Sequence, residues 1–286
     1  MTGFLFRRTA QMLVALLGVS LIVFAIIHLV PGDPIRTALG TRFDPEIYEA
    51  LRVRTGLDQP LFTHYFTWPA NAITGDLGVS FRSGRPVTEL VLERLPATIA
   101  LALAALVIAL IVALPLGIIS AIRQGTALDD VATAVSQVGV SVPDFWAGIM
   151  YILLFSLTLS WLPPSGFVPF SDSPIEFLRH LILPALSVGL VSGAIIFRFV
   201  RSSVLEALNQ DYVRTARAKG LSQRKVILGH VLPNAWIPIV TVVGLQLGFL
   251  LGGVVVVETI FAWPGLGRLA LLAVQDRDFP VLQGAV

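Results

Sequence analysis

Composition and charge indicate that this 286-residue chain lies in a membrane. Hydrophobic residues make up 55% of it and charged residues 13%, and its mean hydropathy is +0.82. A soluble domain is about 25% charged because it needs a hydrated surface around its core. Lipid must therefore solvate much of this chain's surface. A net charge of +2 without blocks of like charge gives no sign of a nucleic-acid partner. Cysteine is absent, which excludes a disulfide framework and a thiolate metal site.

Five segments are apolar enough to be transmembrane helices, each of which needs about 20 residues to cross roughly 30 Å of hydrocarbon. The first is longer than the apolar run of about 7–15 residues in a cleaved signal peptide, and no A-x-A-like site follows it. We therefore expect it to be retained. The third joins a polar first half to an apolar second half that begins at Phe145. The predicted spans are 9–30, 97–121, 131–160, 181–200 and 235–257.

The distribution of Arg and Lys in the short loops predicts the orientation. Two arginines precede the first span, one lies between the second and third, and seven basic residues lie within 198–225. The N-terminus is therefore predicted to be cytoplasmic and the segment 31–96 to be extracytoplasmic. Five spans would leave the C-terminus outside. Because apolar character resumes at 280–286, we expect a sixth span to begin there.

The extracytoplasmic segment 31–96 carries helix signals of its own, which predict a small, mainly helical lid between spans 1 and 2. It opens with a turn at 31–34. Asp44 is a suitable N-cap for a helix with Pro45 at its first position and Gly56 at its end. An aromatic stripe follows, which indicates packing at the membrane interface or on neighbouring spans, with docking of a partner protein as the alternative. The stripe comprises Leu61, Phe62, Tyr65, Phe66 and Trp68.

The cytoplasmic loop 201–232 is predicted to fold as a helix, a tight turn and a short helix. It carries six basic and two acidic residues. Gly220 suits the left-handed position that ends a helix, Ser222 is a good N-cap, and Pro233 is predicted to end the second helix. A rigid, exposed shape of this kind suits the docking of a partner protein. One predicted helical face comprises Val204, Leu208, Tyr212 and Ala216.

Two other interpretations of this loop remain. A DNA-binding helix-turn-helix has the same order of elements, but spans end within a few residues on both sides and leave no supporting core. A loop that only fixes topology and touches anionic membrane lipid would have the same composition.

The spans contain candidates for helix packing or for lining a pathway. Gly244, Gly248 and Gly252 recur every four residues, which predicts either static close packing or a moving interface. Gln246 lies in the middle of the same span and Asp144 lies beside Pro143. Polar groups at membrane depth are candidates for a substrate contact, although Asp144 also fits a place near the cytoplasmic interface. Prolines that would mark bends in the spans are Pro115, Pro143, Pro184 and Pro238.

Two further classes of membrane protein fit the sequence less well. An ion-coupled secondary carrier is expected to show paired intramembrane carboxylates and internal repeats, and neither is found. A membrane-anchored scaffold or sensor is disfavoured because the sequence contains no soluble domain. The phosphate-loop pattern G-x-x-x-x-G-K-[ST] is also absent, so any ATP-driven activity would need a separate ATPase.

Residues 214–233 resemble the cytoplasmic motif of binding-protein-dependent ABC importer permeases. In that motif an E-A-A triplet is followed after three residues by Gly, and later by an aliphatic residue, any residue and Leu-Pro. Here the triplet is Arg214-Thr215-Ala216, the glycine is Gly220, His230 takes the aliphatic position, and Leu232-Pro233 follows. These departures from the motif agree with the dipeptide, oligopeptide and nickel branch of the family. Further branch-like stretches lie, in the order expected, at 28–34, 75–80, 95–98 and 258–269.

The resemblance extends over nearly the whole chain and is strongest to the dipeptide permease type, the first of two paired permeases. It implies a type I ABC importer transmembrane domain in the cell membrane, without catalytic activity or a cofactor of its own. The implied partners are a second homologous permease, two ATP-binding subunits that hold ATP and Mg, an external solute-binding protein and a peptide. Nickel chelates and glutathione are the alternative substrates. The implied ATPase-coupling residues are Asp211, Arg214, Thr215, Ala216, Arg217, Ala218, Lys219, Gly220 and Leu221, of which Ala216 and Ala218 would permit close approach.

Overall fold

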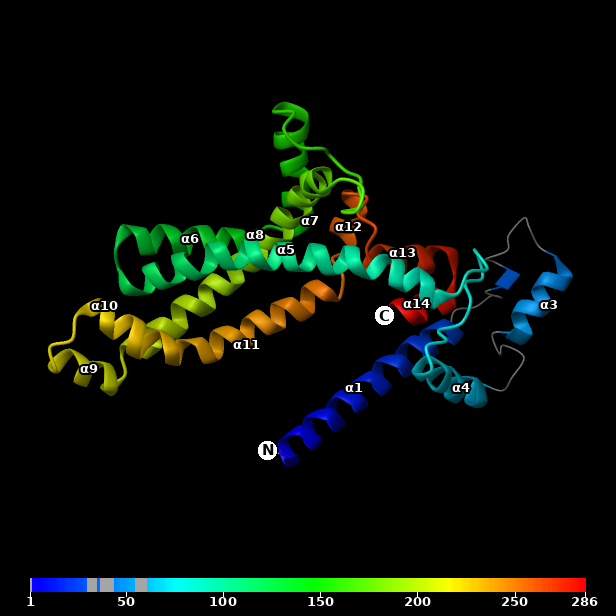
Figure 1. The fold of residues 1–286 in the computed structure, drawn as a ribbon, viewed down its shortest axis with the longest axis horizontal. Helices are drawn as coiled ribbons and strands as arrows, with labels where there is room; N and C mark the ends of the chain where they lie inside the picture. The colour runs from blue at the N-terminus through cyan, green and yellow to red at the C-terminus, as the bar shows by residue number, and fades with distance from the viewer. Residues whose placement is uncertain (1, 30–34, 37–43, 55–60) are drawn as a thin grey trace. The chain divides into compact units, whose positions relative to one another are not determined.

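The computed structural model describes residues 2–29, 35–36, 44–54 and 61–286. Within these residues the regular elements are helices joined by turns and loops, and one isolated β-bridge pairs Val79 with Pro86. It divides into two compact units (Figure 1). Unit 1 consists of Met1–Leu95 and Leu266–Val286, and unit 2 of Pro96–Gly265.

Unit 1 begins with the apolar helix α1. The predicted turn 31–34 and the helix end at Gly56 lie outside the described residues. The N-cap at Asp44 is confirmed, since Glu46 N donates to Asp44 Oδ1 at 2.8 Å and Pro45 begins the helix. The helices of unit 1 are α1 (Thr2–Leu29), α3 (Pro45–Arg54), α4 (Leu61–Ile73), the first turns of α5 (Val87–Ile122), α13 (Leu266–Asp276) and α14 (Phe279–Ala285).

The aromatic helix α4 packs against α1. The Tyr65 hydroxyl hydrogen-bonds Ser20 Oγ at 3.1 Å, and the Tyr65 ring meets the Phe24 ring edge-on at 5.2 Å between centroids. Phe66, in contrast, is exposed. The prediction that this stripe packs on a neighbouring apolar helix is therefore confirmed at Tyr65.

A buried aspartate holds the turn at residues 79–86 within unit 1. Asp278, at the N-cap of α14, accepts hydrogen bonds from Ser80 Oγ at 2.5 Å and from Phe81 N at 3.0 Å. Arg82 N donates to the same carboxylate at 3.4 Å, and the Arg82 side chain pairs with Asp276. The turn and the α13–α14 hairpin are thus held together by charge-assisted hydrogen bonds.

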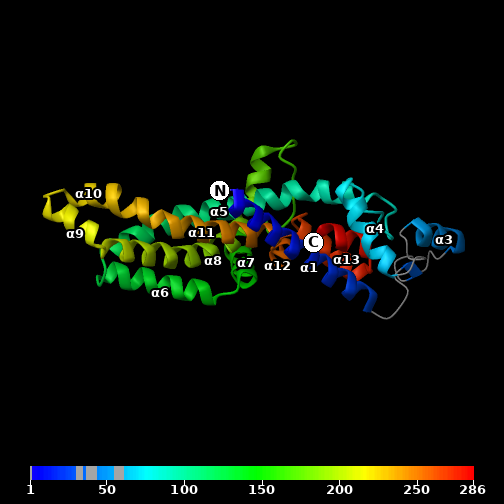
Figure 2. The ribbon, with the colours of Figure 1, turned by 90° about the horizontal axis from the view of Figure 1, so that it is seen from below.

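Unit 2 is a bundle in which α8 contacts α6, α7 and α11 (Figure 2). Its core consists mostly of Ala, Val, Leu and Ile from these helices and from α5. A second cluster surrounds the fully buried Trp263, whose Nε1 donates to Ala97 O at 2.8 Å. The helices outside the coupling region are α5 (continued), α6 (Ala127–Ser141), α7 (Asp144–Tyr151), η2 (Ile152–Thr158), α8 (Pro174–Leu208), α11 (Leu232–Leu251) and α12 (Val255–Ile260).

The described chain has four helices that are long and apolar enough to cross a membrane, or five if the bent pair of α6 with α7 and η2 is one span. The predicted span 131–160 corresponds to this bent pair, in which α6 and α7–η2 meet at 99°, and Pro143 was among the prolines predicted to mark a bend. The bend lies at Val142 and Pro143. Val142 is extended, with ψ at 123°, because the ring of a following proline disfavours helical backbone.

The predicted span 235–257 is divided, since α11 ends at Leu251 and the chain turns at Gly253, where φ is +90°, before α12 begins. The other prolines predicted to mark bends, Pro115, Pro184 and Pro238, lie inside α5, α8 and α11, and bends at them stay a prediction.

Helices α5 and α8 pack closely at two glycines that do not belong to the predicted glycine stripe. A Cβ at Gly189 would lie 2.7 Å from Ala105 O, and one at Gly193 would lie 3.3 Å from Ala109 Cα. A Cβ at Gly244 or Gly248 would meet no described atom within 4 Å. Among the described residues, the Gly189–Gly193 pair is thus a small-residue spacing that brings two helices together, whereas the role of the α11 stripe stays a prediction.

Candidate functional site: the cytoplasmic coupling loop

The polar loop between α8 and α11 contains a separate short helix, α9 (Asp211–Ala218). The predicted continuous helix is interrupted after Leu208, because Gln210 is extended with ψ at 150°. This break shifts the helical register. As a result Val213 and Ala216 form the buried face of α9, and Tyr212 is 40% exposed instead of sharing that face.

Most of the predicted coupling residues lie on the outer surface of α9 and the turn after it. Arg214 pairs with Asp211 at 3.3 Å on this surface, and Thr215 Oγ1 donates to the Asp211 carbonyl at 3.0 Å. Ala216 is the exception: it is only 4% exposed and packs in the bundle core. The other exposed members are Arg217, Ala218, Lys219, Gly220 and Leu221.

Gly220 forms the turn after α9, as predicted. Its φ is +77°, a left-handed value that side chains with a Cβ rarely adopt, and its N–H donates to Arg217 O at 2.9 Å. A Cβ at Gly220 would meet no described atom within 4 Å. The backbone conformation, and not a lack of space, therefore requires glycine at this position.

The second half of the loop differs from the prediction. Pro233 does not end a helix, because α10 (Gln223–Val226) continues through the π-helical segment η3 (Ile227–Val231) directly into α11. Pro233 is the second residue of α11, and the wider π-helical turn of η3 directly before it accommodates the missing N–H within the continuous helix. Ser222 is the N-cap of α10 but makes no side-chain capping hydrogen bond.

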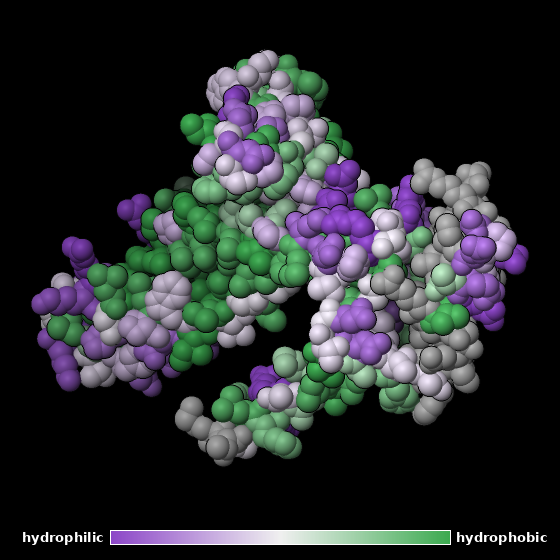
Figure 3. Space-filling model, turned by 45° about the vertical axis from the view of Figure 1, so that its right-hand side comes forward, coloured by the Kyte–Doolittle hydropathy of each residue, from purple (hydrophilic) through white to green (hydrophobic). Residues whose placement is uncertain are grey.

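The loop is rigidly attached to the bundle by apolar side chains. Val213, Val226 and Val231 are fully buried and belong to the same core cluster as Val204 and Ala207 of α8. Figure 3 shows hydrophobic side chains over the body of unit 2 and hydrophilic ones at the end formed by α9 and α10. The exposed basic residues of this end are Arg214, Arg217, Lys219, Arg224 and Lys225.

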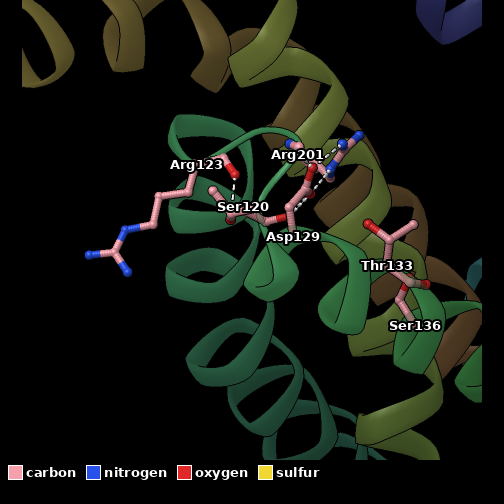
Figure 4. Close-up of polar contacts among 8 residues, drawn as sticks. Ser120, Arg123, Asp129, Thr133, Ser136 and Arg201 are labelled. Carbon is pink, nitrogen blue, oxygen red and sulfur yellow. Dashed lines mark hydrogen bonds and ion pairs between the residues drawn. The ribbon is translucent and has the colours of Figure 1, made fainter.

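A buried ion pair lies two helical turns before the end of α8. Asp129 of α6, which is 3% exposed, accepts from Arg201 Nε at 2.6 Å and from Arg201 Nη2 at 2.8 Å. Ser120 Oγ at the end of α5 and Gly125 N in the α5–α6 turn donate to the same carboxylate at 2.5 and 3.0 Å. Figure 4 shows Arg123, the other arginine nearby, pointing away from this network.

Sequence reasoning missed the Asp129–Arg201 pair. The partners are 72 positions apart, so no local spacing connects them. The sequence did contain a weak signal for this pair. Asp129 and Arg201 each lie beside the end of a predicted span, and a charge buried there without a partner would be energetically unfavourable.

The pathway candidates lie on α7 and α11. Asp144 is half-buried in the first turn of α7, at the bend, where its Oδ1 accepts from Phe145 N at 2.7 Å. Gln246 is half-buried on α11, Gly244 and Gly248 are exposed on that helix, and Gly252 caps its C-terminal end. These residues do not form a cluster with the coupling loop, and their role in a pathway stays a prediction.

The helical arrangement is that of the membrane domain of an ABC importer. A superposition with the inward-facing MetNI methionine ABC transporter gives a TM-score of 0.53 over 65% of this chain and 81% of that one, at 18% sequence identity. This similarity concerns the fold alone.

The sequence comparisons define the family. Residues 113–286 match the model of the binding-protein-dependent transport system inner membrane component, and residues 1–102 match the N-terminal model of such membrane components. The chain belongs to this family.

Two similar proteins are named as permeases of peptide transport systems. The chain is 40% identical to the dipeptide transport system permease protein DppB of Escherichia coli (strain K12), over 100% of this chain and 91% of that protein. It is 41% identical, with the same coverage, to the di/tripeptide transport system permease protein DppB of Pseudomonas aeruginosa (strain UCBPP-PA14).

Proposed function

We propose that this chain is the membrane-spanning permease subunit of an ATP-driven importer for dipeptides or oligopeptides. It forms half of the translocation pathway and transmits the action of a separate ATPase. The names of its relatives favour peptides over nickel chelates or glutathione as the cargo.

The observation that carries this proposal is the construction of the α9 loop. The outer surface of α9 is polar and basic, whereas its inner surface is locked into the bundle core by Val213 and Ala216. An ATPase that binds the outer surface would therefore move the helix together with the bundle. Basic side chains on that surface suit an acidic groove on the partner.

The proposed transport mechanism depends on the rigid attachment of α9 to the bundle. When two ATPases close around ATP and Mg, they bring the coupling helices of the two permeases together and rock the bundles between inward-open and outward-open states. The side chains of this subunit carry out no covalent step. ATP hydrolysis takes place on the partners, and a solute-binding protein delivers the peptide from the opposite side of the membrane.

The proposed topology places α9 and the N-terminus in the cytoplasm of a cell that carries this chain in its inner or plasma membrane. The excess of basic residues in the α9 loop supports this orientation. The full assembly would contain this chain, a second homologous permease, two ATP-binding subunits and the solute-binding protein.

The decisive experiment is co-purification with the products of neighbouring genes, followed by peptide uptake into proteoliposomes. We expect ATPase subunits to purify with this chain and uptake to require ATP. Absence of any ATPase, or uptake that survives ATP depletion under an intact proton gradient, would refute the proposal.

A proline substitution then tests the loop itself. Gly220→Pro replaces a φ of +77° by about −65° and removes the N–H that donates to Arg217 O, so α9 should lose its docking geometry. Gly84→Pro is the matched control, because Gly84 also has a positive φ (+67°) and a bonded N–H, to Ser80 O. We expect Gly220→Pro to insert normally but to lose the ATPase and all uptake, whereas Gly84→Pro keeps the ATPase. Normal uptake in Gly220→Pro would show that the loop is not the coupling element.

A further inference from the structure

The Asp129–Arg201 network joins the α5–α6 hairpin to α8 at a single carboxylate. Each oxygen of Asp129 accepts two hydrogen bonds: Oδ1 from Arg201 Nε and Ser120 Oγ, and Oδ2 from Arg201 Nη2 and Gly125 N. The two bonds from Arg201 are parallel, which fixes orientation as well as distance. Rotation or sliding of α8 relative to the hairpin would therefore break several charge-assisted bonds at once.

Burial makes the loss of these hydrogen bonds costly. Asp129 is 3% exposed and Ser120 is fully buried, while the Arg201 side chain is 25% exposed, so water replaces a lost donor poorly on the buried side of the carboxylate. The acidic neighbour, Asp130, is exposed and lies in the same first turn of α6. Asp130 acts on Arg201 through charge alone, whereas all four hydrogen bonds of the network are made by Asp129.

Arg201 is connected to the coupling helix by continuous structure. Helix α8 runs without interruption from Arg201 to Leu208, and α9 begins three residues later. Val204 and Ala207 on this part of α8 are buried in the same cluster as Val213 and Ala216 of α9. A displacement of α9 therefore displaces the end of α8, and with it the guanidinium of Arg201.

We propose that Asp129 and Arg201 are positioning residues for energy coupling: their bidentate pair carries the movement of α9 and α8 into the α5–α6 hairpin. Without the pair, α8 would rotate against the hairpin, and ATP hydrolysis on the partner would no longer move the bundle as one body. This inference rests on the proposed function, since it needs an ATPase that acts on α9.

The test measures peptide uptake and ATP hydrolysis on the same reconstituted transporter, assembled with its ATPases, second permease and solute-binding protein. Asp129→Asn removes the ion pair at nearly constant volume, and Arg201→Lys keeps the charge but loses the second parallel bond. For both variants we expect ATP hydrolysis to persist and peptides transported per ATP to fall about tenfold, within the usual range of coupling between sites. Asp130→Asn is the matched control and should leave this ratio unchanged.

A merely structural role would give a different result. The yield of assembled transporter, uptake and hydrolysis would then fall together, and the peptides transported per ATP would stay at the wild-type value. That outcome would overturn the inference. If Asp129→Asn does not assemble, the ratio in Arg201→Lys decides, because that variant leaves no buried charge unpaired. Failure of the proposed function is distinguishable, since the wild-type protein would then bind no ATPase or take up no peptide.

Discussion

Two identical substitutions, Gly189→Ala in α8 and Gly244→Ala in α11, should change stability by different amounts. Each exchanges glycine for alanine inside an apolar helix, so intrinsic helix propensity favours both by about 1 kcal/mol. The surroundings differ. A Cβ at Gly189 would lie 2.7 Å from Ala105 O and 3.1 Å from Ile108 Cβ, whereas one at Gly244 would meet no described atom within 4 Å.

The magnitude follows from what must move at Gly189. The nearest atom belongs to the backbone of α5, so relief requires the two helices to separate. Overpacking of this kind costs about 1–3 kcal/mol. Gly189→Ala is therefore expected to be between neutral and about 2 kcal/mol less stable than wild type, and about 1–3 kcal/mol less stable than Gly244→Ala.

The assay is titration of the purified chain from mild detergent into sodium dodecyl sulfate, followed by far-ultraviolet circular dichroism. The two variants share composition and helix propensity, so their difference isolates the packing between α5 and α8. If Gly189→Ala unfolded at the same or a higher denaturant fraction than Gly244→Ala, the assignment of the close helix contact to Gly189 would be refuted.

Two further predictions concern buried hydrogen bonds. Trp263→Phe removes the donor to Ala97 O and leaves space beside a fully buried ring, so we expect about 1–3 kcal/mol of lost stability in the same titration; a loss below about 0.5 kcal/mol would contradict this. Asp278→Ala removes the acceptor of Ser80 Oγ and of the Phe81 amide, each bond worth about 1.5–3 kcal/mol. Hydrogen exchange at the Phe81 amide should therefore accelerate by about tenfold or more, and an unchanged rate would show that the turn is held by other contacts.

Local signals in the sequence were sufficient for several features. Asp44 and Pro45 begin a helix because the capping hydrogen bond and the proline ring act within one turn. Gly220 ends α9 because a left-handed backbone excludes most other residues. These features depend on neighbouring residues alone, so a pattern of a few letters predicts them.

Predictions that depended on continuity between segments were less accurate. Whether a proline bends or ends a helix depends on its surroundings, so Pro143 marks a bend as predicted, whereas the helix predicted to end at Pro233 continues through η3 into α11. The face of α9 was misassigned for a similar reason. The break at Gln210 shifted the register by a fraction of a turn, which buried Ala216 with Val213 and exposed Tyr212.

The sequence by itself determined that this chain lies in a membrane and which family it resembles. It also determined that the loop around Gly220 is basic and contains a tight turn. Composition and short motifs are sufficient for these features because they are local properties. Only the tertiary structure decided which glycines bring helices together and that Asp129 meets Arg201. Both are contacts between distant segments. They depend on how the helices rotate and cross, and rotation is set by the packing of the whole bundle.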